Sequence, residues 1–212
     1  MPESPVFVFV PGAWHAADTF DVVRDLMQKR GLATEAISTP SVGAFPPDKG
    51  LHADIEHTRA VLKEMVEAGR QIVLVNHSYG GMVGAGAVEG LGYSQRCKVG
   101  LPGGVIMVVW MAAFVTPKAE GDFEIEAADA KSFHELATHE PWHEIPSMYL
   151  FCDKDGAIPL AVQESFAHTL GNPVTYHIDA SHSAFLSMPE KVIDGLEIAL
   201  KEGRQESGIA VN

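Results

Sequence analysis

The sequence is poor in cysteine, in positive charge and in long apolar runs, and each shortage excludes a class of protein. Among 212 residues there are 2 cysteines, Cys97 and Cys152, too few for a disulfide framework. Lys and Arg number 15 against 28 Asp and Glu, and this formal charge of −13 repels phosphate backbones and anionic lipids. We therefore expect free thiols, a cytoplasmic location and no nucleic-acid or membrane partner.

Signals for export, anchoring and metal binding are also missing. The N-terminus, M-P-E-S-P, is acidic and proline-rich where a signal peptide is basic, and the apolar run Val6 to Val10 is too short for its hydrophobic region. No run approaches the length of a membrane span. The 10 histidines form no spaced set of the H-E-x-x-H kind, which makes zinc-dependent hydrolysis a weak alternative, and no metal or other cofactor is expected.

The length suits one domain, residues 1–212, because no internal repeat, low-complexity tract or linker divides the chain. Segments typical of strands alternate with segments of helical period, which predicts an α/β fold: a mostly parallel, twisted sheet with helices on both faces. Residues 90–104 show no clear period, which predicts a loop, and the tail from Gly203 is expected to fray. The expected strands are 6–10, 33–37, 72–75, 105–113, 148–152 and 174–178, and the expected helices are 18–31, 52–68, 160–170 and 189–201.

The stretch from Gln71 to Gly84, Q-I-V-L-V-N-H-S-Y-G-G-M-V-G, has the pattern of a strand, a sharp turn and a helix. Ser78 stands at the apex of the turn. Such a turn can hold a nucleophile above the end of a parallel sheet when the residues two before and two after it are small. Gly80 meets this requirement and Asn76 does not, so the motif by itself is a weak signal.

A serine nucleophile requires a base, and the base requires a group that orients it. His182, in the polar loop D-A-S-H-S after the last expected strand, is the candidate base. Asp155, in C-D-K-D-G after the preceding strand, is the candidate orienting acid, with Asp153 and Asp179 as rivals. Asp155 could instead be a turn aspartate before Gly156, and His182 a capping residue. The order Ser, Asp, His is the one that a nucleophile turn of this type predicts.

Five segments, spread over nearly the whole chain, carry a resemblance: V-F-V-P-G-A-W-H, N-H-S-Y-G-G-M-V, W-M-A-A-F-V-T-P, Y-L-F-C-D-K-D-G-A-I-P and S-H-S-A-F-L-S-M-P-E. The chain resembles the α/β-hydrolase family, and within it the branch of plant methylesterases, hydroxynitrile lyases and uncharacterised fungal and bacterial hydrolases. The resemblance implies the α/β-hydrolase fold, with Ser78 as nucleophile, His182 as general base and acid, and Asp155 as third member. It also implies an oxyanion hole formed by the backbone N–H groups of Ala13 and Tyr79.

The oxyanion assignment has a physical basis as well. Ala13 follows a glycine in the first strand-to-helix loop, and Tyr79 stands at a helix N-terminus, so both N–H groups can point at a developing oxyanion. Trp14 and His15, in the same loop as Ala13, are expected to contact substrate. Phe114 and Phe185 are further candidates for the pocket, with a place in the core as the alternative. His77 is expected to point away from the site.

The sequence departs from the family pattern at the turn, in the first loop and in the cap. Asn76 replaces a glycine of the turn, and Pro11 stands where many relatives have histidine. Between the strands that precede Phe114 and Asp155, relatives usually carry a longer cap. Here a short, acidic lid from Thr116 to Pro141 is expected to form one or two short helices. A lid this short leaves the pocket open or closed by a second subunit, and the second alternative predicts a homodimer that forms through the lid.

These observations predict a cofactor-free serine hydrolase that cleaves an ester, lactone or thioester of a small apolar molecule through an acyl-enzyme. A carbon–carbon bond hydrolase, or a cyclase that passes the acyl group to an internal nucleophile, would use the same triad. A non-catalytic protein that binds a small ligand on this fold is a third alternative. A hydroxynitrile lyase is not favoured, because Ser183 and Gly12 stand where the related lyases have lysine and threonine.

Overall fold

A six-stranded sheet forms the centre of the molecule in the computed structural model, which describes residues 5–120 and 134–209. All five neighbouring pairs are parallel and the order is β2-β1-β3-β4-β5-β6, so the predicted α/β architecture is confirmed. The strands are β1 (Val6–Val10), β2 (Ala33–Ala36), β3 (Gln71–His77), β4 (Gly104–Met111), β5 (Ser147–Cys152) and β6 (Val174–Ile178).

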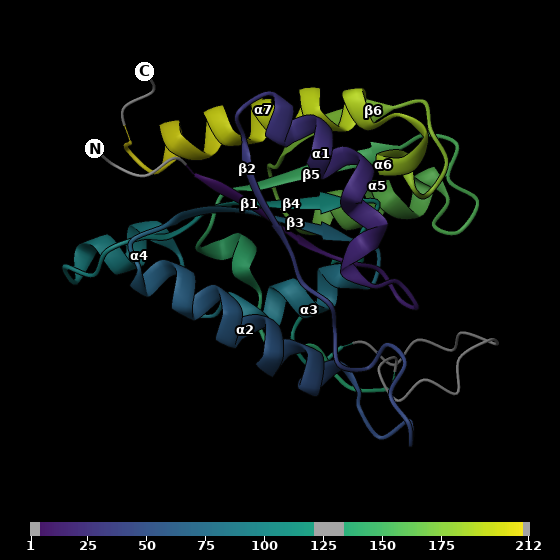
Figure 1. Cartoon of the computed structure of the whole chain (residues 1–212), viewed down its shortest axis with the longest axis horizontal. Coiled ribbons are helices and arrows are strands. Elements are labelled where there is room, and N and C mark those ends of the chain that lie inside the picture. The colour runs from purple at the N-terminus through teal and green to yellow at the C-terminus, as the bar shows by residue number, and fades with distance from the viewer. Residues whose placement is uncertain (1–4, 121–133, 210–212) are drawn as a thin grey trace.

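Helices cover both faces of this sheet (Figure 1). α2 and α3 lie on one face and α1 and α7 on the other, while α5 packs with the α2 side. None of the described helices is long and apolar enough to cross a membrane. The helices are α1 (Asp21–Lys29), α2 (Leu51–Glu67), α3 (Gly80–Ala87), α4 (Tyr93–Lys98), α5 (Leu160–Thr169), α6 (Ala184–Ser187) and α7 (Pro189–Glu206), with 3₁₀ turns at Ala17–Phe20 and Pro141–His143.

The core consists of two apolar layers, one on each side of the sheet, and β1 shows why the strands are apolar without interruption. Val6, Val8 and Val10 point into the layer beneath α2 and α3. Phe7 and Phe9 point into the layer beneath α1 and α7. Because successive strand residues face opposite sides, a strand covered on both faces needs an apolar residue at every position.

The structure corrects the sequence-based boundaries in two places. Residues 90–104, expected to be a loop, contain α4, and α7 continues past Gly203 to Glu206. α4 has 6 residues, too short to show a helical period in the sequence. It is fixed instead by the buried guanidinium of Arg96, which donates hydrogen bonds to the carbonyl oxygens of Val66, Pro102 and Gly103.

The lid segment leaves and rejoins the sheet through a neck formed by residues 118–120 and 135–137. The Ala119 N–H donates to the Ala137 carbonyl at 3.0 Å, and the Ala137 N–H donates to the Glu120 carbonyl at 2.9 Å. The Glu135 carboxylate accepts a hydrogen bond of 2.8 Å from the His52 N–H in the first turn of α2. The short helices expected between Thr116 and Pro141 fall mainly on residues 121–133, outside the described residues.

Candidate active site

A cavity of about 240 Å³ lies at the carboxyl ends of the strands. The loops after five strands line it: residues 12–15 after β1, Ser78 after β3, Phe114 after β4, Ala157 and Ile158 after β5, and His182 after β6. The cavity includes the topological switch point of the sheet. From β1 the chain continues to β2 at one edge of the sheet, whereas from β3 it continues to β4, toward the opposite edge. Ligands bind at this kind of crevice in open parallel sheets.

Ser78 occupies the sharp turn that the sequence predicts between β3 and α3. Its φ of 53° is rare for a residue with a side chain, and such strained backbone often marks a functional site. Its carbonyl accepts hydrogen bonds from Gly81 (2.9 Å) and Phe114 (3.1 Å), which hold the turn. A β-carbon at Gly80 would lie 2.5 Å from the Val10 carbonyl oxygen, so only glycine lets α3 approach β1 this closely.

His182 and Asp155 are in direct contact. His182 Nδ1 lies 2.7 Å from Asp155 Oδ2, and because a carboxylate can only accept, the proton is on Nδ1. This tautomer leaves Nε2 as the unprotonated nitrogen. The Asp155 side chain is completely buried, whereas that of His182 is 23% exposed.

The environment of Asp155 keeps its carboxyl group ionised. Burial alone would raise the pKa, but hydrogen bonds from His182, Ile158 and Ala157 outweigh burial, and the pKa lies below its ordinary value. The N–H groups of Ala157 and Ile158 reach Oδ1 at 2.7 and 2.9 Å. A fixed carboxylate is therefore available to orient His182 and to stabilise its positive charge.

The two rival aspartates have other partners. Asp153 accepts a hydrogen bond of 2.7 Å from His177, and Asp179 accepts one of 2.7 Å from Lys154. Within the described residues neither of these carboxylates bonds to His182. Of the three candidate carboxylates, Asp155 is thus the one in contact with His182.

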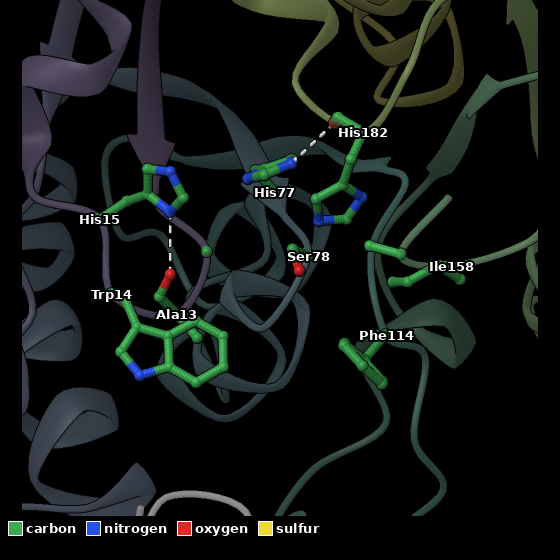
Figure 2. Close-up of a pocket in the computed structure, with 10 residues that line it drawn as sticks. Ala13, Trp14, His15, His77, Ser78, Phe114, Ile158 and His182 are labelled. Atoms are coloured by element: carbon green, nitrogen blue, oxygen red, sulfur yellow. Dashed lines mark hydrogen bonds between the residues drawn. The ribbon is translucent and has the colours of Figure 1, made fainter. Parts of the chain in front are cut away.

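Ser78 lies beside His182 in the cavity (Figure 2). In the described part of the chain the Ser78 hydroxyl forms no direct hydrogen bond with His182. Catalytic hydrogen bonds are commonly long before substrate binds and shorten in the reacting complex. The side chains of Ser78, His182 and Asp155 are therefore brought to one site.

Both expected oxyanion residues are held in place by side-chain hydrogen bonds. His15 donates from Nδ1 to the Ala13 carbonyl at 2.8 Å, as Figure 2 shows. Tyr79 donates from its hydroxyl to Asp54 Oδ2 at 2.8 Å. The buried Asp54 carboxylate also accepts from the N–H and hydroxyl of Ser41, at 2.9 and 2.6 Å. These contacts restrict the backbone of the loop after β1 and of the turn after β3.

The cavity wall combines aromatic and aliphatic side chains. Trp14, His15 and Phe114, each expected from the sequence, line it together with Ile158. Trp14 is 65% exposed at the mouth. Phe185 does not line the cavity: it is fully buried in the core, where its ring packs against Phe20 (centroids 4.7 Å apart) and His77 (4.9 Å). Proximity to His182 in sequence suggested a place in the pocket, but α6 turns this side chain into the core.

The sequence profile of the Alpha/beta hydrolase family matches residues 7–130, more than half of the chain. The chain belongs to the α/β-hydrolase family. A family member from Aspergillus novofumigatus, the alpha/beta hydrolase nvfD, is 27% identical over 237 positions, covering 89% of this chain and 94% of the relative. A probable hydrolase, R7, from a Phoma species is 24% identical, covering 90% and 96%.

Solved structures show the same fold. The methylesterase MES16 from Arabidopsis has a TM-score of 0.71 at 19% identity, covering 93% of this chain and 99% of that one. Polyneuridine aldehyde esterase has a TM-score of 0.71 at 16% identity, covering 92% and 99%. A pyrethroid hydrolase from Sphingobium faniae has a TM-score of 0.67 at 19% identity, covering 92% and 96%. Family membership and the two fungal relatives support a hydrolase.

Two residues of this α/β-hydrolase's site were not recognised from the sequence. His77, expected to point away, lines the cavity and contacts His182. Gln163, fully buried on α5, accepts a hydrogen bond from the Cys152 N–H and donates to the carbonyls of Cys152 and Ile158. It thereby closes the loop that carries Asp155. One glutamine in a helical segment gives no sequence signal of such a role.

Histidine and acidic side chains, which can hold metal ions, are numerous in the sequence of this α/β-hydrolase. Across residues 5–120 and 134–209, no group of three or more His, Cys, Asp or Glu side chains is arranged to hold a metal ion. Cys152 is buried next to the site, and burial together with the nearby Asp155 carboxylate raises the pKa of its thiol to about 12. The thiol is therefore protonated and a poor nucleophile, which leaves Ser78 as the candidate.

Proposed function

We propose that this protein is a cofactor-free serine hydrolase that cleaves an ester, lactone or thioester of a small apolar molecule. One observation carries the proposal. Ser78, on a backbone turn of φ 53°, shares a cavity with His182, whose Nδ1 lies 2.7 Å from the buried Asp155 carboxylate. A nucleophile, a base with a defined tautomer and a buried orienting acid are the three parts that acyl transfer by serine requires.

In the proposed reaction, Ser78 Oγ attacks the carbonyl carbon while its proton passes to His182 Nε2. The N–H groups of Ala13 and Tyr79 stabilise the negative oxygen that develops on the substrate. His182 then gives the proton to the leaving alcohol or thiol, and the acyl group remains on Ser78. A water molecule, deprotonated by His182, attacks the acyl carbon and releases the acid, which restores the free enzyme.

The walls of the cavity support the substrate class. Trp14, Phe114 and Ile158 supply apolar surface, and a volume of about 240 Å³ suits a small acyl or alcohol group. Proteins of the same fold include two that are named as esterases and one that is named as a pyrethroid hydrolase. Carbon–carbon bond cleavage, or cyclisation on the same triad, would differ in the substrate that the cavity accepts rather than in these residues.

The test is steady-state hydrolysis of short and medium p-nitrophenyl esters by the unaltered protein and by Ser78→Ala. Because the members of a triad act as a unit, Ser78→Ala is expected to lower kcat by about a thousandfold or more. Ser165→Ala, an exposed serine on α5, is the matched control and should keep full activity. If Ser78→Ala is as active as the unaltered protein, the proposal is wrong.

A fluorophosphonate probe extends the test to substrates that are not in the ester set. Labelling of the unaltered protein but not of Ser78→Ala would indicate an activated serine even where p-nitrophenyl esters are not hydrolysed. The absence of both turnover and labelling would instead favour a protein that binds a small ligand without catalysis.

The location of the protein and its oligomeric state are the subjects of two further proposals. We propose a cytoplasmic location on the basis of the two free thiols, Cys97 and Cys152. We also propose a homodimer through the lid, whose described part includes the exposed Leu136. A monomeric mass by light scattering at high protein concentration would contradict the dimer.

A further inference from the structure

His77 lies between the loop that carries Ala13 and the loop that carries His182, which are the proposed oxyanion donor and the proposed base. It is the last residue of β3, directly before Ser78, and it is completely buried. On one side its Nε2 lies 3.0 Å from the backbone carbonyl oxygen of His182. On the other side the ring packs against Gly12, where an added β-carbon would lie 2.9 Å from His77 Nδ1. One imidazole thus touches both the loop after β1 and the loop after β6.

The contact with His182 defines the protonation of this ring. A carbonyl oxygen only accepts hydrogen bonds, so His77 donates from Nε2, as the dashed line in Figure 2 marks. Nδ1 is buried and has no hydrogen-bond partner among the described residues, which allows Gly12 to pack closely against it. Burial, followed by the charge of His182, lowers the pKa of His77 to about 3, so the ring is neutral near pH 7.

Neighbouring rings fix the orientation of this imidazole. Phe185 meets it edge-on with centroids 4.9 Å apart, from the core side. The ring of His182 lies 4.6 Å away and that of His15 6.4 Å away, on the cavity side. When His182 accepts a proton from serine, its neighbour at 4.6 Å carries no charge and does not oppose the transfer.

We propose that His77 is a positioning residue that sets the distance between the oxyanion loop, residues 12–14, and the base His182. The inference rests on the proposed function, because it gives His77 its role through His182 and Ala13. The specific requirement is an N–H group at the position of Nε2, facing the His182 carbonyl. A buried histidine with a packing role alone would need the volume of the ring but not this donor.

Three substitutions separate the donor from the ring. In His77→Gln the side-chain amide nitrogen reaches the position of Nε2, so the hydrogen bond to His182 is kept. In His77→Asn the amide nitrogen falls near the position of Nδ1, toward Gly12, and in His77→Leu there is no donor. Displacement of a catalytic group by about 1 Å can cost about a hundredfold in rate. His77→Asn and His77→Leu should lose about 10- to 100-fold, mainly in kcat, and His77→Gln no more than about threefold.

The experiment measures kcat and KM for p-nitrophenyl ester hydrolysis by these variants, with Ser78→Ala in the same series and thermal unfolding of each. Recovery of kcat in His77→Gln relative to His77→Asn supports the inference. If His77→Gln loses as much as His77→Asn, or if His77→Leu stays within about threefold of the unaltered protein, the inference is wrong while the hydrolase assignment stands. If Ser78→Ala does not lower turnover, the proposed function fails and the inference with it.

The tautomer gives a second readout that does not depend on turnover. Nitrogen-15 NMR of the unaltered protein should show His77 with a protonated Nε2 and a bare Nδ1 at neutral pH. A His77 ring protonated on Nδ1 would overturn the inference even where all variants are active. If His77→Leu does not fold, the pair His77→Gln and His77→Asn decides, because both replace the ring by an amide.

Discussion

The side-chain amide of Asn76 occupies the space that a β-carbon on Gly84 would fill: that carbon would lie 2.1 Å from Asn76 Oδ1. Asn76 is the residue of β3 that replaces the usual small residue of the nucleophile turn, and Gly84 lies one turn into α3. Both are buried, and neither polar atom of the Asn76 amide has a hydrogen-bond partner among the described residues. Gly84 on α3 therefore leaves the space that Asn76, larger than the usual glycine of the motif, requires.

This relationship predicts that the two positions are energetically coupled. Gly84→Ala should gain about 1 kcal/mol of helix propensity but lose more, about 1–3 kcal/mol, through overpacking against Asn76. In the Asn76→Ala background the overpacking is absent, so the same change should be neutral or stabilising. Urea unfolding of the two single variants and the double variant measures the coupling. Equal effects of Gly84→Ala in both backgrounds would contradict it.

The contact between His182 and Asp155 predicts that substitution of Asp155, and not of Asp153, lowers the rate of ester hydrolysis. Asp155→Asn removes the charge that stabilises protonated His182 and can stabilise the wrong tautomer, so kcat/KM should fall by about 10²- to 10⁴-fold. Asp153→Asn is the matched control, because Asp153 contacts His177 instead. Its kcat/KM should stay within about threefold. The opposite ranking of the two variants in ester hydrolysis would show that the orienting acid is misassigned.

The hydrogen bonds of Gln163 predict that this residue supports the loop that carries Asp155. Gln163→Met has a similar volume but lacks the hydrogen bonds to Cys152 and Ile158, so the loop that carries Asp155 should become less well fixed. We expect about tenfold lower kcat/KM, together with a lower melting temperature. Glu164→Gln, an exposed neighbour on α5, is the control and should change neither quantity. Normal activity of Gln163→Met would mean that the loop needs no support from α5.

His77 predicts how stability depends on pH. Its pKa is about 3 when folded, against an ordinary value of 6.5, so between these values the unfolded chain binds a proton that the native state does not. Its contribution is therefore complete above about pH 7 and is lost as pH falls toward about 3. At about pH 5 the loss is about 2 kcal/mol relative to about pH 7.5.

Comparison with His77→Gln isolates this contribution from the other titrating groups. Between about pH 7.5 and about pH 5, the free energy of unfolding should fall by about 2 kcal/mol less in His77→Gln than in the unaltered protein. Urea unfolding at the two pH values provides the measurement. Parallel pH dependences in the two proteins would show that His77 is not a buried neutral group.

Local patterns in the sequence were sufficient to predict the fold and to predict that Ser78, Asp155 and His182 lie close together. The run from Ile72 to Val75, the turn at Ser78 and the glycines after it specify strand, turn and helix within fourteen residues, from Gln71 to Gly84. Because every strand of the sheet is parallel, residues that follow strands meet at one edge, which is why the sequence predicts Asp155 and His182 near Ser78.

The features that the sequence did not reveal depend on the orientation of side chains and on contacts between residues that are distant in sequence. His77 precedes Ser78, and its hydrogen bond to His182 spans 105 residues of sequence. Phe185 is three residues from His182, but the orientation of α6 buries its ring. Gln163 contacts Cys152, Asp155 and Ile158 through one side-chain amide. No hydrophobic period encodes such contacts, since they depend on which side chains tertiary packing brings within about 3 Å.

The neck beneath the lid has an evolutionary consequence. Its hydrogen bonds between Ala119, Glu120 and Ala137 join backbone atoms, so they place few demands on the residues between the two arms. The alignment with nvfD extends over 237 positions, more than the 212 residues of this chain, so that relative has segments without a counterpart here. A junction closed by backbone hydrogen bonds can carry inserts of different length while the strands below keep their register.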